Sequence, residues 1–331
     1  MRVAKWGILC GFLGLVWFGG WAIVIRMPGE SFQGPIPSLS AEERVLEQAL
    51  RSHVITLAGE IGERNLFHAD KLVQAAEYIR TTFQHAGYEV SEQEYRVSGQ
   101  ACLNIEVEVN GTTRPEEIVL VGAHYDSVKG SPGANDNGTG VAAVLALAEG
   151  LAASHPSRTI RFVAFANEEP PFFQSHQMGS RVYAKRSRER GEQIRLMVSL
   201  ETIGYYTEEA GSQSYPFPLQ LIYPREGNFI AFVSNTDNGP WVRKTVESFR
   251  RHTQFPSEGA ALFGWLPGVG WSDHWAFWKE NFPAVMVTDT ALFRDPYYHT
   301  AKDTPDHIHY EHLARVVSGL QSVILDIANQ P

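Results

Sequence analysis

Apolar residues recur along this chain with two periods, and the alternation of those periods predicts strands separated by helices. The segments predicted as strands are 88–97, 103–109, 118–122, 159–166, 196–200, 219–223 and 284–288. The segments predicted as helices lie at 72–83, 141–153, 180–190, 241–252 and 313–327. Strands that alternate with helices imply right-handed crossovers. We therefore expect a single large α/β domain with a mostly parallel or mixed central sheet and helices on both faces.

The beginning of the chain has a different pattern from the rest. No charge interrupts Trp6–Ile25, and an apolar helix of that length spans roughly 30 Å, the thickness of a bilayer core. A cleavable signal peptide is the alternative, but no typical cleavage site follows the run. We expect residues 1–27 to form a signal anchor with one transmembrane helix, 28–40 a Pro- and Ser-containing linker, and 41–331 the folded domain.

Charge and cysteine content narrow the location and the partners. Arg2 and Lys5 precede the apolar run, so the positive-inside rule predicts a membrane-anchored domain outside the cytoplasm. The net charge of −9 and the absence of a basic stripe argue against a nucleic-acid partner. Cys10 lies in the apolar run, where Gly7 makes a poor lipid-attachment motif, and Cys102 stands alone in the domain. No disulfide within the domain is expected, and nothing in the composition fixes an oligomeric state.

Acidic and imidazole side chains follow several predicted strands. His124 and Asp126 come after the strand at 118–122 and point the same way in extended chain, so Asp126 can support the imidazole. Taken alone, the two residues are explained as well by a hydrogen-bonded pair in a turn. Asp136 precedes a predicted helix and could cap it, although its two oxygens could also join two cations.

Further acidic and imidazole side chains complete this set of residues. Glu168 and Glu169 end the strand at 159–166 just before two prolines, which excludes a helix surface, although an exposed acidic loop remains an alternative. Glu201 ends the strand at 196–200, and His299 lies in an aromatic loop. Since the carboxyl ends of parallel strands meet at one sheet edge, we expect these groups to converge. Carboxylates and imidazoles without thiolates suit zinc in a hydrolytic site.

Several short motifs resemble those of the M28 family of zinc aminopeptidases, in order and in spacing from about Ala41 to Ala328. They are Gly122-Ala-His-Tyr-Asp-Ser127, Gly133-Ala-Asn-Asp-Asn-Gly138, Asn167-Glu-Glu169, Met178-Gly-Ser180, Leu200-Glu-Thr-Ile-Gly204, Ser272-Asp-His274 and Tyr298-His-Thr300. The resemblance implies a zinc-exopeptidase-like fold and two zinc ions per chain.

The resemblance also implies a role for each residue. His124 and Glu201 would hold one zinc, Glu169 and His299 the other, and Asp136 would bridge them. In the same way, Glu168 would be the general base and Asp126 would orient His124. Glu201 stands where many relatives have aspartate, which puts the fine geometry in question. The family further implies a cis peptide bond after Asp136.

The expected reaction is hydrolysis of the first peptide bond of a peptide with a free amino terminus. Asp273 and His274 either lie near the substrate pocket or begin an aromatic-rich helix that Ser272 caps. The candidates for pocket lining, which favour an apolar first residue, are Trp265, Trp271, Phe293, Tyr297 and Tyr298.

Three other functions stay open. A glutaminyl cyclase shares the fold and uses a single zinc. A metallo-carboxypeptidase would need a cation for the terminal carboxylate, and Arg294 or Lys302 could supply it. A membrane-tethered binding module without activity would be expected to lack ligands, and none of them is missing here.

Overall fold

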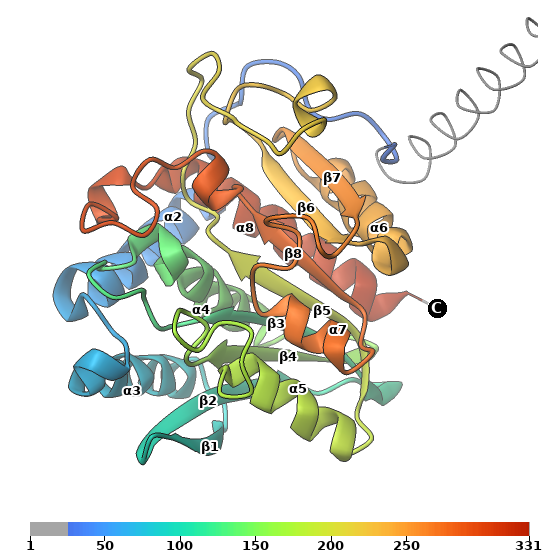
Figure 1. Cartoon of the computed structure of the whole chain (residues 1–331). Coiled ribbons are helices and arrows are strands. Elements are labelled where there is room, and N and C mark those ends of the chain that lie inside the picture. The colour runs from blue at the N-terminus through green and yellow to red at the C-terminus, as the bar shows by residue number, and fades with distance from the viewer. Residues whose placement is uncertain (1–25, 331) are drawn as a thin grey trace, which may run out of the picture.

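A mixed eight-stranded sheet organises the chain into one α/β domain (Figure 1). The computed structural model describes residues 26–330. The strand order is β1-β2-β4-β3-β5-β8-β6-β7. Their bounds are Ser91–Val97 (β1), Gln100–Val109 (β2), Arg114–His124 (β3), Arg158–Phe165 (β4), Gln193–Glu201 (β5), Ile230–Asn235 (β6), Ser257–Leu262 (β7) and Ala284–Thr288 (β8). The expected α/β fold class is confirmed.

The four central strands β4, β3, β5 and β8 run parallel, while β2 and β6 run antiparallel to their central neighbours. Helices cover both faces, as expected. Their bounds are Ala41–Val54 (α2), Ala69–His85 (α3), Gly140–Leu151 (α4), Gly179–Glu189 (α5), Gly239–His252 (α6), His274–Lys279 (α7) and Tyr310–Asn329 (α8). Helices α5 and α7 lie together on one face, and α2, α3, α4, α6 and α8 lie on the other (Figure 1).

Strand β3 shows how the two faces are filled. Val119 and Val121 belong to the core shared with α4 and α8, and Ile118 and Leu120 belong to the core under α5 and α7. Successive side chains of a strand point to opposite faces. An apolar run without alternation is therefore what a strand buried on both faces requires.

Three sequence predictions of elements need correction. The segment 219–223, predicted as a strand, is a short 3-10 turn at Leu219–Leu221, because Pro216 and Pro218 cannot donate ladder hydrogen bonds. Strand β1 begins at Ser91 rather than at residue 88. Strands β6 and β7 were not predicted, and β7 contains Gly259 and two alanines instead of the β-branched residues typical of strands.

The predicted transmembrane helix at Trp6–Ile25 lies outside the described residues. Across residues 26–330, no helix has both the length and the apolar character needed to cross a bilayer. The segment after it packs on the domain: Arg250 donates to the carbonyls of Pro28 and Gly29, and Arg315 donates to that of Pro37.

The start of α2, which directly follows this segment, provides a test. Ser40 and Glu43 form a capping box, in which each side chain accepts a hydrogen bond from the other residue's backbone N–H. We expect Ser40→Ala to lower the free energy of unfolding by about 1 kcal/mol. Urea unfolding of the full chain measures this, with the exposed Ser38→Ala as matched control. An equal change in both variants would contradict the capping role.

Candidate metal centre

The chain brings all seven sequence-predicted site residues to one edge of the sheet. His124 is the last residue of β3 and Glu201 the last of β5. Glu168 and Glu169 follow β4, the other neighbour of β3. Asp136 lies in the helical turn Ala134–Thr139 that leads into α4, and His299 lies in the loop between β8 and α8. Adjacent parallel strands therefore deliver three of the five segments side by side.

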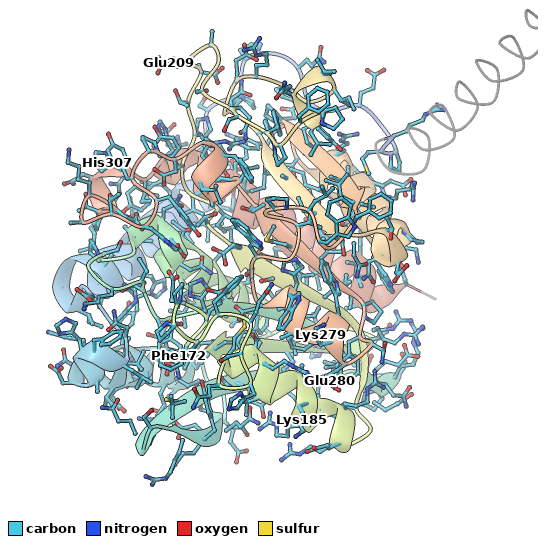
Figure 2. The ribbon with its side chains drawn as sticks, viewed as in Figure 1. Phe172, Lys185, Glu209, Lys279, Glu280 and His307 are labelled. Atoms are coloured by element: carbon cyan, nitrogen blue, oxygen red, sulfur yellow. The ribbon has the colours of Figure 1, made fainter. Side chains whose placement is uncertain are left out.

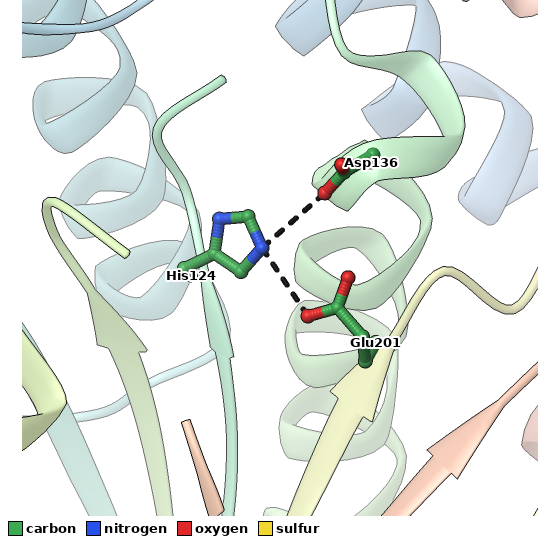
Figure 3. A group of neighbouring side chains, drawn as sticks. All are labelled: His124, Asp136 and Glu201. Carbon is green, nitrogen blue, oxygen red and sulfur yellow. Dashed lines mark ion pairs between the residues drawn. The ribbon is translucent and has the colours of Figure 1, made fainter. Parts of the chain in front are cut away.

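Two groups of potential ligands meet at Asp136. In the first, His124 Nε2 faces both carboxylates and lies 3.3 Å from Asp136 Oδ1 and 3.3 Å from Glu201 Oε2 (Figure 3). In the second, His299 Nε2 lies 3.0 Å from Asp136 Oδ2 and 3.2 Å from Glu169 Oε2. Within each group the ligand atoms lie within 4.8 Å of one another. Asp136 thus turns one oxygen toward each group.

The buried polar atoms of both groups fit a metal ion. His124 Nε2, both carboxylate oxygens of Asp136 and Glu169 Oε1 are buried without a hydrogen-bond partner among the described residues. A buried polar atom without a partner is costly, and a buried carboxylate more so unless it is paired or binds a metal. Imidazole nitrogen and carboxylate oxygen are donors that zinc accepts. The residues present therefore suit the ion that the family implies.

The electrostatics of the cluster agree with this fit. Burial and the nearby Asp136 carboxylate raise the pKa of Glu169 to about 8. Although burial opposes the change, Asp136 and Glu169 raise the pKa of His299 to about 10. Burial also raises the pKa of Glu201. Each raised pKa means that the acidic cluster retains a proton, which offsets part of its negative charge. A bound metal cation would offset this negative charge in the same way.

Glu168 lies at the edge of the first group and is buried. Its Oε2 is 4.0 Å from His124 Nε2, farther than the oxygens of Asp136 and Glu201. Burial, together with the carboxylates of Glu201 and Glu169, raises the pKa of Glu168 well above its usual value. A carboxylate with increased proton affinity beside a group of potential metal ligands has the properties of a general base.

Asp126 makes a contact that the sequence did not indicate. Its two carboxylate oxygens accept the backbone N–H groups of Glu168 and Glu169, at 3.0 and 3.1 Å. His124 Nδ1 lies 3.2 Å from the backbone oxygen of Asp126 and 3.5 Å from its carboxylate. Asp126 thus ties the strand end that carries His124 to the strand end that carries the glutamate pair.

Three residues that the sequence did not single out for this role hold the ligands. The Asp303 carboxylate accepts the backbone N–H groups of Asn135 and Asp136. Asn137 donates to Leu200 O, and its own oxygen accepts the N–H of Thr202, so it fixes the Asp136 turn against the end of β5. The Asp136–Asn137 peptide bond is cis, as the resemblance implied.

Ser272 is the third such residue, and its segment resolves the two interpretations of 272–274. Its hydroxyl donates to Glu201 Oε2 at 2.7 Å, so it supports a ligand and does not cap α7. Asp273 and His274 are fully buried. Burial raises the pKa of Asp273 to about 7, although His124 lowers it. The segment therefore belongs to the metal centre's surroundings as well as to the helix start.

An apolar pocket opens beside the first ligand group, with a volume of about 870 Å³ that includes its open mouth. Glu201 lies on its wall. Of the aromatic residues predicted as lining, Trp271, Phe293 and Tyr298 line it, and Trp265 and Tyr297 do not. Arg294 does not line the pocket but is buried directly behind its wall, where its Nε donates to the lining residue Gln213 and its Nη1 to the backbone oxygen of the lining residue Phe229.

Comparisons with known proteins identify the family. A model of Peptidase family M28 matches residues 104–324. The chain is 36% identical over 286 residues to uncharacterized protein YfbL of Escherichia coli (strain K12), covering 84% of this chain and 87% of that protein. It is 27% identical over 232 residues to a probable leucine aminopeptidase of Arthroderma otae, covering 65% of this chain and 55% of that relative.

Solved structures share the fold. BSAP, a zinc aminopeptidase from Bacillus subtilis, superposes with a TM-score of 0.69 at 16% identity, covering 86% of this chain and 95% of that chain. LapB from Legionella pneumophila superposes with a TM-score of 0.66 at 21% identity, covering 92% and 79%. The family match spans most of the sheet and every predicted ligand. The chain therefore belongs to Peptidase family M28.

Proposed function

We propose that this chain is an aminopeptidase whose site holds two zinc ions and uses Glu168 as its general base. The observation that carries the proposal is the shared position of Asp136, with one oxygen toward His124 and the other toward His299. His124 and Glu201 would complete one zinc site, and Glu169 and His299 the other. The leucine aminopeptidase relatives support the reaction, although the chain spans only about half the length of the Arthroderma relative.

The residues of the chain divide the chemistry among them. Zinc, when bound, supplies a Lewis acid that polarises the scissile carbonyl and lowers the pKa of water. Glu168 accepts the proton of the attacking water and returns it to the departing amine. Asp126 fixes the backbone of Glu168 and so holds the Glu168 carboxylate at the edge of the first group of ligands. Glu168 lies outside both ligand groups, so its buried carboxylate can pair with the positively charged amino terminus of a substrate.

The surroundings of Arg294 bear on the carboxypeptidase alternative. Its Nε and Nη1 donate to Gln213 and to backbone carbonyls, its buried Nη2 has no hydrogen-bond partner among the described residues, and its side chain does not line the pocket. Lys302 is exposed. Neither cation is therefore placed to receive a substrate carboxylate inside the pocket. This supports the aminopeptidase hypothesis over the carboxypeptidase alternative.

The first test replaces the proposed base. Glu168→Gln keeps the shape of the side chain but cannot accept the proton, so we expect kcat to fall by about 10²- to 10⁴-fold with zinc content unchanged. Amino-acid anilide hydrolysis and elemental analysis measure the two quantities. The control is Glu189→Gln, an exposed substitution in α5. A Glu168→Gln protein with near-normal turnover would remove Glu168 from this role.

The second test counts the ions. We expect about two zinc ions per chain, about one in His299→Asn, and fewer than one in Asp136→Asn, because only Asp136 belongs to both groups. Since zinc binds the folded site, its removal by a chelator should also lower the melting temperature, and added zinc should restore it. The exposed His309→Asn serves as control. One zinc in the parent chain together with ring closure of an amino-terminal glutamine peptide would favour the glutaminyl cyclase instead.

We also propose that residues 1–27 anchor the domain, with 28–40 as its connection, and that the domain lies outside the cytoplasm. The support is the uncharged run Trp6–Ile25 behind Arg2 and Lys5. The full chain should then remain in membranes after an alkaline carbonate wash, and a chain lacking residues 1–25 should be soluble. Release of the full chain by the wash would refute the anchor.

A further inference from the structure

A row of residues crosses the sheet from the metal centre to the far end of the apolar pocket. Glu201 of β5 pairs with Thr288 of β8, Thr288 pairs with Ala231 of β6, and Ala231 pairs with Glu258 of β7. Side chains that are directly opposite across neighbouring strands point to the same face. Glu258 therefore lies on the pocket side of the sheet, in register with the metal ligand Glu201.

Apart from Thr288, the floor between these two glutamates is apolar. It is made by alternate residues of three strands, whose side chains share one face. These residues are Ala231, Val233, Ala260, Leu262 and Met286. Leu266, Val269 and Phe293 cover the pocket from the connecting loops. A side chain that enters from the metal centre thus passes over hydrocarbon before it meets a carboxylate.

The Glu258 carboxylate has no ion-pair partner among residues 26–330. The nearest guanidinium, that of Arg250, donates to Ser257 and to the carbonyls of Pro28 and Gly29. Burial raises the pKa of Glu258, while Arg250 and the Ser31 hydroxyl lower it. Because the Glu258 carboxylate is half-buried and makes no ion pair, a cation that enters the pocket can stabilise it further.

Two tyrosines lie near Glu258 and direct their hydroxyl groups elsewhere. Tyr215 and Tyr223 stack with ring centroids 5.8 Å apart, and both line the pocket. Their hydroxyl groups donate to Pro224 O at 2.6 Å and to Gly259 O at 2.9 Å, so neither is used on Glu258. Aromatic faces attract ammonium and guanidinium groups.

The length of the row matches a long side chain. Three strand spacings of about 4.8 Å put roughly 14 Å between the backbones of Glu201 and Glu258. Three extended covalent bonds cover about 3.5 Å, so the side chain of lysine or arginine reaches roughly 6 to 8 Å from its Cα. The rest of the distance between the two backbones is accounted for by the scissile carbonyl beside the metal centre at one end and by the hydrogen bond to Glu258 at the other. A leucine side chain ends well short of the carboxylate.

We propose that the pocket selects an amino-terminal residue with a basic side chain, lysine or arginine, and that Glu258 is the residue that determines this specificity. The apolar floor contacts the methylene groups, and the carboxylate pairs with the terminal cation. This inference rests on the proposed aminopeptidase function. It replaces the expectation of an apolar first residue, because the mainly apolar wall ends at the acid Glu258 on the side away from the metal centre.

The test compares two substrates with the same stem, lysyl and norleucyl p-nitroanilide. For the zinc-loaded full chain we expect kcat/KM to be at least about tenfold higher for the lysyl substrate, because a desolvated charge pair discriminates strongly against a partner that lacks the charge. Glu258→Gln should lower the lysyl value by about tenfold or more and leave the norleucyl value within about twofold. Retained norleucyl activity also shows that the variant is folded.

The control is Glu209→Gln, an exposed acid at the outer tip of the loop that leads over the pocket (Figure 2). It should change neither rate. A parent chain that prefers the norleucyl substrate, with the same ratio in Glu258→Gln, would overturn the specificity and leave the aminopeptidase function standing. Failure of the zinc-loaded chain to cleave either substrate would overturn the proposed function itself.

Discussion

The concentration of buried carboxylates at one sheet edge is the constraint on which this structure depends. Asp136, Glu168, Glu169 and Glu201 are all buried within reach of two imidazoles. Such a group is stable only where cations, protons or directed hydrogen bonds offset the repulsion and the loss of water. Imidazoles supply part of this compensation, and the raised pKa values of Glu168 and Glu169 show that it is incomplete. Divalent ions are the natural complement.

The acids of the site divide into two kinds by what their oxygens face. Asp126 and Asp303 have both oxygens occupied by backbone N–H groups, so they fix the positions of neighbouring segments. Asp136 and Glu169 have buried oxygens without hydrogen-bond partners and remain available to a metal. The same residue type thus serves as a structural clamp at Asp126 and as a candidate metal ligand at Asp136. The backbone environment of each carboxylate decides between the two roles.

The sequence predicted that the candidate ligands lie close together, because the local pattern carries the necessary information. Strand β8 was predicted to the residue, since its apolar run is uninterrupted, and His124 and Glu201 were found because they end such runs. Asp303 could not be found, because its partners lie 167 and 168 residues away and only the fold brings them together. Glu258 was not predicted for a related reason. Its strand β7 has a weak β-strand propensity, and the position of Glu258 in the pocket follows only from the pairing of strands in the sheet.

The segment after residue 26 has a further consequence for the open edge of the sheet. Strand β7 pairs with β6 alone, so its other side presents backbone groups that another chain's strand could join. The Ser31 hydroxyl accepts the N–H of Ser257, and Met27 packs against Gly259. A stretch whose composition suggests only a tether therefore also shields β7 and hinders edge-to-edge association between molecules.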